Sequence, residues 1–477
     1  MIFSEANFWL FFAVVFALYL VLSHRGQNRM LLVASYVFYG AWDWRFLGLI
    51  FLSTAIDYLV ALRMDREVSQ QRRKMLLWVS LAGNLGMLAV FKYLGFFVAS
   101  FTELLTYAGL RADPVILNII LPVGISFYTF QTLSYTIDVY RRDIRAEPDF
   151  LNFALFVAFF PQLVAGPIER ATNLLPNVVN PRRITWDGLS RGAVLCLVGL
   201  IKKIVIADGV AGSVNAIYAN PSPSGLDVLV GTWLFAIQIY CDFSGYTDIA
   251  RGVSKMLGFD LMRNFAQPYF AANPQEFWRR WHISLSTWLR DYLYISLGGN
   301  RHGEWKTYRN LMLTMLLGGL WHGAAWNFVL WGAYQGGLLS VHRALAGRNG
   351  HAGEGVRRSA GDWLWRVVRI ALFFQVVCYG WLLFRAQSFG QIRDFTGRLL
   401  DITAPGWSTL TFPALPQATL AGIMLLFIWD LCNEVSGNSR FYEALPAPAR
   451  AALWSGMLYF LAFGLTTTTT AFIYFQF

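Results

Sequence analysis

Charged side chains are scarce in this sequence, making up 14% of its 477 residues against 56% hydrophobic residues. A soluble enzyme of this length needs a more polar surface, so the composition excludes that class and favours a polytopic membrane protein. The HExxH, GxSxG, Walker A and GxGxxG patterns are also missing. The sequence therefore gives no sign of a zinc protease, a serine hydrolase or a nucleotide-binding fold.

Cysteine is equally rare. The four cysteines, Cys196, Cys241, Cys378 and Cys432, fall in hydrophobic segments with no CxxC spacing. They are predicted to be small core residues, and we expect no disulfide framework, no metal and no bound cofactor. The net charge of +11 comes from Lys and Arg clustered between hydrophobic runs, which favours a cytoplasmic membrane face over a nucleic-acid partner.

Long hydrophobic runs dominate the chain. The first lacks a basic n-region and a cleavage site before it, so it is predicted to be a retained span. The positive-inside rule then assigns each loop to a side and predicts an all-α protein of about ten transmembrane helices plus two re-entrant segments, with both termini outside. The runs are 8–23, 30–41, 46–62, 76–110, 116–140, 150–166, 192–218, 228–250, 311–342, 367–384, 420–431 and 453–475.

Two of these runs are irregular. Residues 76–110 are too long for one upright span and contain Gly83, Gly86, Lys92 and Gly95, which predicts a bent or tilted helix, or two short pieces. Residues 150–166 contain Pro161 and have basic residues on both sides, which favours a re-entrant segment. We expect a single integral-membrane domain over 1–477 with a motif-rich core at 115–340 and the largest polar inserts at 251–310, 343–366 and 386–417.

The run 311–342 carries the strongest functional signal. It places His322 in an apolar stretch interrupted by Gly318-Gly319 and Gly323. The first 11 residues make about 16 Å of helix, roughly half of a hydrocarbon core. Both flanks, 251–310 and 343–369, are basic and are predicted to be cytoplasmic. His322 is therefore expected at the turning point of a re-entrant hairpin, beside a hydrated pocket. The alternative is a histidine that only hydrogen-bonds a neighbouring helix.

The insert 251–310 is predicted to lie at the cytoplasmic interface. Asn273, Pro274 and Glu276 are typical of a helix start. One aromatic helix is expected to follow in the headgroup region, where His282 has either an interfacial or a chemical role. Its stripe is Phe277, Trp281, Leu285, Trp288 and Tyr292, flanked by Arg279, Arg280 and Arg290.

Other polar groups within or beside spans are less specific. Asp242 and Asp248 are interpreted as structural partners of nearby arginines, and Arg290 with Asp291 as an ion pair. Tyr128 and Gln131 lie in a span rich in hydroxyl groups, where they line a polar cavity or join helices. The residues leave both roles open.

Five motifs in order across 115–340 resemble the membrane-bound O-acyltransferase family. They look like the bacterial branch that includes the membrane subunit of alginate O-acetylation. The motifs are GISFYTFQTLSYTIDVYR (124–141), FFPQLVAGPI (159–168), CDFSGYTDIARG (241–252), NPQEFWRRWHISLSTWLRDYLYISLGGNR (273–301) and YRNLMLTMLLGGLWHGAAWNFVLWGAYQG (308–336).

The resemblance implies a helical bundle around a central tunnel, with His322 as the catalytic histidine and His282 as a second one nearer the cytoplasmic mouth. It implies a multi-pass inner-membrane O-acetyltransferase that draws on a cytoplasmic donor, acetyl-CoA as co-substrate, for an exopolysaccharide such as alginate. Periplasmic acyltransferases and other polysaccharide-modification proteins are the partners it implies, beside membrane lipids.

The chemistry suggests roles for the remaining candidates. Trp321, Trp326 and Asn327 are expected to orient the imidazole or the acyl carbonyl. Arg279, Arg280 and Arg290 are expected to attract polyanionic coenzyme A. Two alternatives stay open: D-alanyl transfer from a carrier-protein thioester, and a transporter that makes and breaks no bond.

Overall fold

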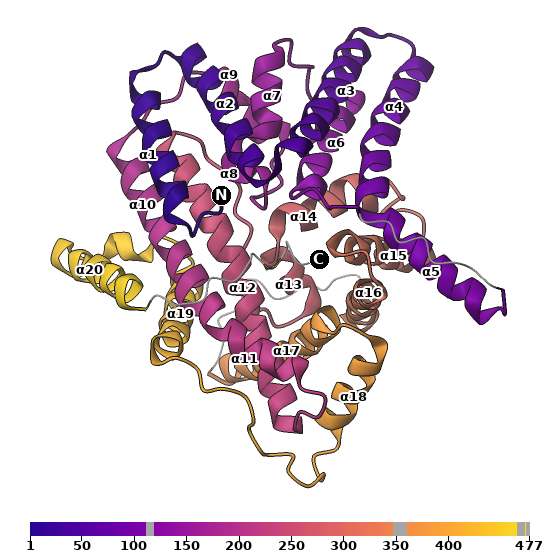
Figure 1. The fold of residues 1–477 in the computed structure, drawn as a ribbon, viewed down its shortest axis with the longest axis vertical. Helices are drawn as coiled ribbons and strands as arrows, with labels where there is room; N and C mark the ends of the chain where they lie inside the picture. Colours follow the sequence, from indigo (N-terminus) through magenta and orange to yellow (C-terminus); the bar gives the residue numbers. More distant parts are fainter. Residues whose placement is uncertain (111–118, 347–359, 465–472, 474–477) are drawn as a thin grey trace. The chain divides into compact units, whose positions relative to one another are not determined.

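The computed structural model describes residues 1–110, 119–346, 360–464 and 473 (Figure 1). Within these residues every regular element is helical, which confirms the all-α prediction. Five of the described helical stretches are long and apolar enough to cross a membrane. The total of about ten spans and the two re-entrant segments stay predictions. The five stretches are His24–Arg66, Gln70–Tyr107, Gly225–Met256, Gly361–Arg385 and Gln417–Ser436.

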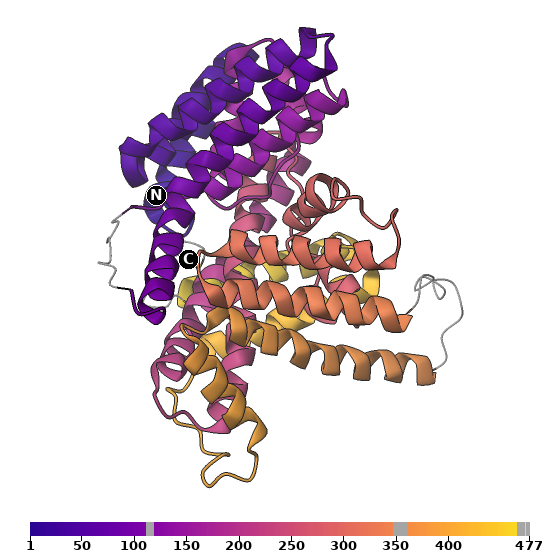
Figure 2. The same cartoon turned by 90° about the vertical axis from the view of Figure 1, so that its right-hand side faces the viewer.

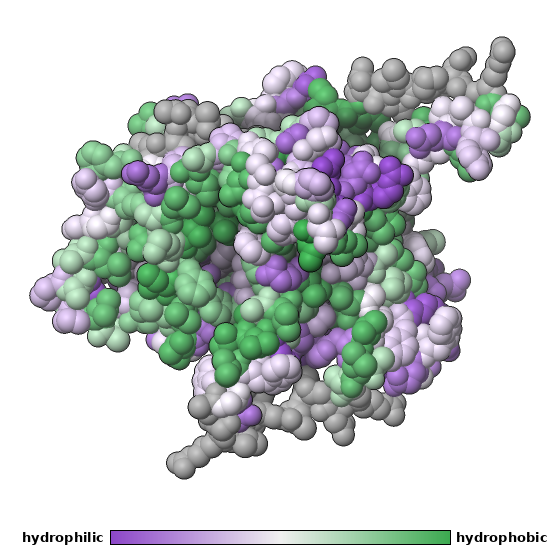
Figure 3. Space-filling model, turned by 90° about the horizontal axis from the view of Figure 1, so that it is seen from below, coloured by the Kyte–Doolittle hydropathy of each residue, from purple (hydrophilic) through white to green (hydrophobic). Residues whose placement is uncertain are grey.

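Hydrophobic side chains are exposed on many of these helices. Leu10, Trp78, Leu372 and Met424 each expose more than half of their surface, and hydrophobic residues cover much of the face drawn in Figure 3. So much exposed apolar surface is unfavourable in water, whereas contact with lipid tails is favourable for it. The exposed surface therefore supports the membrane environment that the composition predicts.

The chain divides into two compact units, and residues 1–196 and 250–262 form the first. In Figure 2 its indigo to magenta helices run alongside one another. The single-domain prediction stays a prediction. The helices of this unit are α1 (Ala6–Val21), α2 (His24–Asp43), α3 (Leu47–Arg66), α4 (Gln70–Leu88), α5 (Leu94–Tyr107), α6 (Ile125–Arg141), α7 (Phe150–Ala158), α8 (Phe160–Leu163), α9 (Ala171–Val179) and the first part of α10 (Trp186–Leu200).

Both irregular runs are interrupted in the structure. The π-helical segment η2 (Ala89–Tyr93) contains Lys92 and joins α4 to α5, so the run 76–110 is interrupted where the bend was expected. The other irregular run breaks at Phe159, just before Pro161 enters α8. The first residues of the predicted span 116–140 lie outside the described residues, and α6 begins after Gly124.

The second unit comprises residues 197–249 and 263–477. Figure 2 shows α15, α16 and α17 side by side, coloured from salmon to orange. The end of the predicted last span lies outside the described residues. The elements are η3 (Ile201–Ala207), α11 (Asp208–Ala219), most of α12 (Gly225–Met256), η4 (Pro268–Phe270), α13 (Pro274–Arg280), α14 (Ile283–Trp288), η5 (Leu289–Tyr294), α15 (Glu304–His322), α16 (Trp326–Ala346), α17 (Ala360–Arg385), α18 (Phe389–Leu400), α19 (Gln417–Ser436), η6 (Phe441–Ala444) and α20 (Ala447–Phe463).

Candidate active site

His322 is the last residue of α15, at the turn of a helical hairpin. Residues 323–325 connect α15 to α16, so the predicted position at a turning point is confirmed. The predicted break at Gly318-Gly319 is wrong, because α15 continues through both glycines. A Cβ on Gly319 would lie 2.2 Å from the carbonyl oxygen of Phe328, and one on Gly332 would lie 2.4 Å from that of Met315. These glycines let the two helices approach closely instead of ending one of them.

His282 occupies a break in the aromatic segment. The prediction of one continuous helix is wrong: α13 ends at Arg280, and α14 begins at Ile283. Between them His282 adopts a left-handed backbone with φ 42° and ψ 56°. Such a conformation costs of order 1–3 kcal/mol for a residue other than glycine and is found at functional sites.

Asn264 holds this break in place. Its backbone carbonyl accepts from the backbone N–H of Ile283 at 3.0 Å, and its side-chain oxygen accepts from the N–H of Ser284 at 3.2 Å. Both of these donors belong to the first turn of α14, where no intrahelical partner exists. Asn264 therefore fixes the residues that directly follow His282.

The break brings the two histidines together. Their ring centroids lie 6.4 Å apart at an angle of 62°, and both side chains are buried. Trp321 contacts both rings, with centroids at 6.0 Å from His282 and 5.2 Å from His322. A pair of imidazoles at this distance suits two groups that act on one small reacting centre.

Aromatic rings enclose the pair. Phe243 lies edge-on to His282 at 4.7 Å. Trp331 and Phe384 pack against His322 at 5.1 and 5.6 Å. An apolar enclosure favours the neutral form of an imidazole. Burial, with a smaller contribution from nearby His322, lowers the pKa of His282 well below its ordinary value.

A cavity of about 790 Å³ opens beside this pair. Three arginines, Arg279, Arg290 and Arg343, line it together with Ile283 and Met315, and its described lining contains no carboxylate. The cavity does not reach the ring of His322. Trp278, which also lines it, lies 5.9 Å from Trp331, and Trp331 covers His322. The hydrated tunnel expected around His322 therefore stays a prediction, with two tryptophan rings between the cavity and the imidazole.

The other predicted residues near His322 have mixed surroundings. Trp321 lies against both imidazoles, as described above. Trp326 is half exposed at the start of α16. The side-chain amide of Asn327 donates to the carbonyls of Phe384 and Ala386, both at 3.1 Å. Asn327 thus ties α16 to the end of α17, next to Phe384 in the wall of the site.

The three arginines do not act alike. Arg279 and Arg290 line the cavity, and Arg290 pairs with Asp291 at 2.7 Å, which confirms the predicted ion pair. Arg280 points elsewhere and binds Glu276 at 2.7 Å and Glu434 at 2.5 Å. Of the predicted coenzyme A contacts, only Arg279 and Arg290 therefore lie at the cavity.

The stripe of the aromatic segment is buried. Phe277, Trp281 and Leu285 are each about 1% exposed, so the predicted placement against lipid headgroups is wrong for them. Trp281 packs on Phe277 at 5.6 Å and on Trp381 of α17 at 4.8 Å. The stripe is core packing that supports the backbone on both sides of His282. The predicted helix start is confirmed, because the Asn273 side chain accepts from the Glu276 N–H at 2.8 Å.

Tyr128 and Gln131 lie in α6 of the first unit, where both are buried. Gln131 donates to the carbonyl of Phe156 at 2.6 Å, which joins α6 to α7. Of the two roles left open, this contact favours the joining of helices for Gln131.

The aspartates of α12 are structural ion-pair partners, as expected, and the partners that the structure shows are lysines. Lys202 binds Asp248 at 2.8 Å, and Lys203 binds Asp242 at 2.8 Å and Asp208 at 2.9 Å. Both lysines belong to η3, a π-helical stretch far from α12 in sequence. The periodicity of 192–218 did not reveal that these lysines face the interior.

Histidine, cysteine and carboxylate side chains are the candidate metal ligands in the part of the chain that the structure describes. Its histidines, cysteines and carboxylates form no group of three able to hold a metal ion, and all four cysteines are free thiols. Three of them are buried, which confirms their interpretation as core residues.

Sequence reasoning missed four residues of the site: Asn264, Phe243, Trp331 and Phe384. The sequence around the three aromatic residues is like that around ordinary core residues, so no local pattern distinguishes them from the many other aromatic residues. Asn264 precedes His282 by 18 residues, and only the folded chain shows what it binds.

Comparison with known proteins adds to this geometry. Residues 38–349 match the sequence model of the membrane-bound O-acyltransferase family. The chain is 41% identical over 444 residues to a probable alginate O-acetylase of Azotobacter vinelandii, covering 93% of this chain and 86% of that protein.

The names of two more distant relatives differ from that of the alginate O-acetylase in the acceptor and, for the second, also in the acyl group. A peptidoglycan O-acetyltransferase of Helicobacter pylori is 34% identical over 410 residues, covering 79% of this chain and 75% of the relative. A teichoic acid D-alanyltransferase of Bacillus subtilis is 27% identical over 299 residues, covering 57% of this chain and 70% of the relative. Both histidines fall inside the residues matched by the family model.

Proposed function

We propose a donor and an acceptor for this chain, which belongs to the membrane-bound O-acyltransferase family and is an acyltransferase. It moves acetyl groups from cytoplasmic acetyl-CoA across the bacterial inner membrane, for O-acetylation of an exopolysaccharide such as alginate. Because members of this family transfer acyl groups, the alternative of a transporter that makes and breaks no bond no longer applies. The observation that carries the proposal is the pair of buried imidazoles 6.4 Å apart, inside an aromatic enclosure.

His322 is the proposed general base. A thioester carbonyl needs little activation, whereas an alcohol is a poor nucleophile at neutral pH. As the acceptor oxygen attacks the acetyl carbonyl, His322 takes the hydroxyl proton and a C–O bond forms. The C–S bond then breaks, and the departing thiolate takes the proton from His322. The acceptor is a polysaccharide hydroxyl or the hydroxyl of a periplasmic acyltransferase that passes the acetyl group on.

His282 supports this step as a neutral imidazole. Its enclosure lowers its pKa, so at neutral pH it presents one N–H donor and one acceptor nitrogen. A donor beside the attacked carbonyl stabilises the developing oxyanion. The strained backbone and the Asn264 contacts keep this ring in one place, as electrostatic stabilisation requires.

The basic cavity supports the choice of donor. Coenzyme A carries several phosphates, and three arginines line the cavity: Arg279, Arg290, which pairs with Asp291, and Arg343, which lies 3.6 Å from Glu304. Its volume of about 790 Å³ falls in the usual range for small-molecule sites, about 300–1,000 Å³. Met315 lies seven residues before His322 on α15, a rise of about 10 Å, which is within reach of a long flexible thiol arm.

The test is the acetyl content of the secreted polysaccharide. A strain that lacks this chain is complemented with the wild type, with His322→Ala or with His302→Ala, and glycan acetyl groups are measured by mass spectrometry. His302 lies in the exposed loop before α15 and is the matched control. We expect the wild type and His302→Ala to restore acetylation and His322→Ala to restore less than about one part in a hundred, since general base catalysis contributes about 10²–10⁴. Full restoration by a well-expressed His322→Ala chain would remove the assignment.

A further inference from the structure

A second cavity, of about 950 Å³, lies between α17 and α19. Its walls are mostly apolar, and five charged side chains also line it: Glu276, Arg280, Arg366, Asp430 and Glu434. Several hydrophobic wall residues on α17 and α19 are more than half exposed, so this side of the groove faces the surroundings of the protein. The exposed wall residues include Trp363 and Val367 of α17 and Phe427 and Val435 of α19.

The groove has the length of one lipid leaflet. On α19 its lining runs from Ile423 to Val435, and on α17 from Trp363 to Phe374. These stretches rise about 18 and 17 Å, close to half of a hydrocarbon core about 30 Å thick. Both helices come from the candidate spans, and the lined stretches are the first part of α17 and the last part of α19. The groove therefore follows the cytoplasmic half of both spans in the predicted topology.

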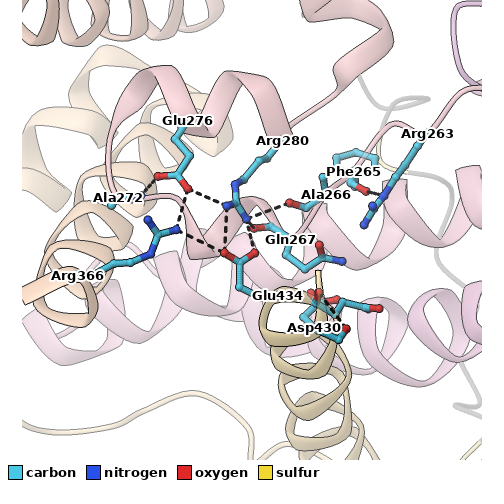
Figure 4. A network of polar contacts seen from close by, with 12 residues as sticks. Arg263, Phe265, Ala266, Gln267, Ala272, Glu276, Arg280, Arg366, Asp430 and Glu434 are labelled. Atoms are coloured by element: carbon cyan, nitrogen blue, oxygen red, sulfur yellow. Dashed lines mark hydrogen bonds and ion pairs between the residues drawn. The ribbon is translucent and has the colours of Figure 1, made fainter. Parts of the chain in front are cut away.

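Four of these charged side chains form one ion-pair network (Figure 4), in which Arg366 and Glu434 lie near the ends of the lined stretches of α17 and α19. Arg366 of α17 lies 3.1 Å from Glu276 and 3.5 Å from Glu434, and Arg280 binds the same two carboxylates. The side chains of Arg366 and Glu434 each retain 24% exposure. Arg280 and Glu276 retain 18% and 20%, so the cluster presents cations and anions side by side, and Arg366 and Glu434 are the most exposed of the four.

We propose that this groove binds a phospholipid with a zwitterionic ammonium–phosphate headgroup from the cytoplasmic leaflet. Its phosphate lies against Arg366, its ammonium against Glu434, and its acyl chains fill the groove along α17 and α19. Charge complementarity selects this class, because an anionic headgroup without an ammonium would leave Glu434 and Glu276 facing negative charge. Trp363 at the charged end suits the headgroup region.

The site is separate from the acyl-transfer chemistry. None of the groove residues lines the arginine-rich cavity, and neither histidine belongs to it. It is nevertheless linked to the catalytic segment, because Arg280 and Glu276 belong to α13, which ends two residues before His282. A bound headgroup adds partners to the cluster that holds α13.

The experiment is lipid retention measured by native mass spectrometry. The full-length chain is purified in mild detergent, supplied with equal amounts of phosphatidylethanolamine and phosphatidylglycerol, and compared as wild type, Ala371→Trp and Leu372→Trp. Ala371 lines the groove and Leu372 is its exposed neighbour outside the lining, so the second variant is the matched control. We expect the wild type and Leu372→Trp to retain one phosphatidylethanolamine and Ala371→Trp to lose at least ninety per cent of it.

Three outcomes would overturn the proposal. Equal retention by Ala371→Trp would place the lipid elsewhere. Preference of the wild type for phosphatidylglycerol would contradict the headgroup assignment. A dimer of the chain that Ala371→Trp dissociates would show that a second copy fills the groove. The double variant Arg366→Gln with Glu434→Gln keeps the cluster neutral, and we expect it to lose the preference between the two lipids while still retaining acyl chains.

Discussion

At the scale of single residues, the site depends on two imidazoles with different backbones. His322 ends a regular helix, whereas His282 sits in a left-handed turn between two short ones. Periodicity in the sequence continues across His282, so it predicts one helix. The break arises because Asn264 satisfies the first donors of α14, a tertiary contact that no local pattern contains. His322 was predictable because an imidazole in an apolar run is rare and costly.

The lowered pKa of His282 gives a pH-dependent stability. The native state favours the neutral ring, and the unfolded chain has the ordinary pKa of about 6.5. The contribution of His282 to the free energy of unfolding is therefore fully present above about pH 6.5. It decreases by about 1.4 kcal/mol per pH unit as the pH falls from there toward the lower pKa of the folded state.

The variant His282→Asn removes this titration and keeps a residue that tolerates the left-handed backbone. Thermal unfolding in detergent at pH 7.5 and 5.5 checks the expectation. We expect the wild type to lose more stability between these values than His282→Asn. Equal losses in the two proteins would show that the His282 ring does not titrate as its burial implies.

At the scale of elements, the sequence alone does not tell whether a glycine ends a helix or allows two helices to pack closely. Gly318-Gly319 has the composition of a helix break, yet α15 runs through it because Gly319 faces the backbone of α16. Gly323 does mark the end of the helix. The hairpin was predictable from its flanks, whereas the role of each glycine depends on which face of α15 it occupies.

The hairpin packing predicts opposite effects for two glycines in it. A Cβ at Gly319 would lie 2.2 Å from the Phe328 carbonyl, whereas one at Gly337 would meet nothing within 4 Å. We expect Gly319→Ala to destabilise the protein by about 1–3 kcal/mol through overpacking and to reduce acyl transfer, because α15 carries His322. Gly337→Ala is the control and should be neutral or stabilise by about 0.5–1 kcal/mol. Thermal unfolding and activity of the two variants test this, and equal stability would contradict the close approach.

At the scale of the whole molecule, loops that the charge pattern assigns to one side of the membrane meet within the second unit. The loop 220–225 and the insert 386–417 are both predicted to be outside, and Leu226 at the end of that loop donates to the carbonyl of Trp407 at 2.9 Å. Asp227 accepts from the Thr411 hydroxyl at 2.6 Å. The three elements of the Arg280, Arg366 and Glu434 cluster come from segments predicted to be inside. These contacts agree with the predicted topology.

Cysteine labelling tests that topology. In a Cys432→Ser background, where the three remaining cysteines are buried, Arg393→Cys and Lys306→Cys place single thiols on exposed positions. A membrane-impermeant maleimide added to intact spheroplasts should label the first and not the second, and inverted vesicles should reverse the result. Labelling of both positions from the same side would contradict the prediction that they lie on opposite sides of the membrane.

The account as a whole claims that His322 passes an acetyl group from a cytoplasmic thioester to an acceptor on the other side. The most direct measurement uses inverted inner-membrane vesicles from the producing strain, whose cytoplasmic face is outward, supplied with radiolabelled acetyl-CoA. With the wild-type chain, we expect label to accumulate on polysaccharide or protein in the vesicle lumen, and with His322→Ala at equal abundance we expect none above background. Equal lumenal label with both chains, or transfer only from a carrier-protein thioester, would contradict the account.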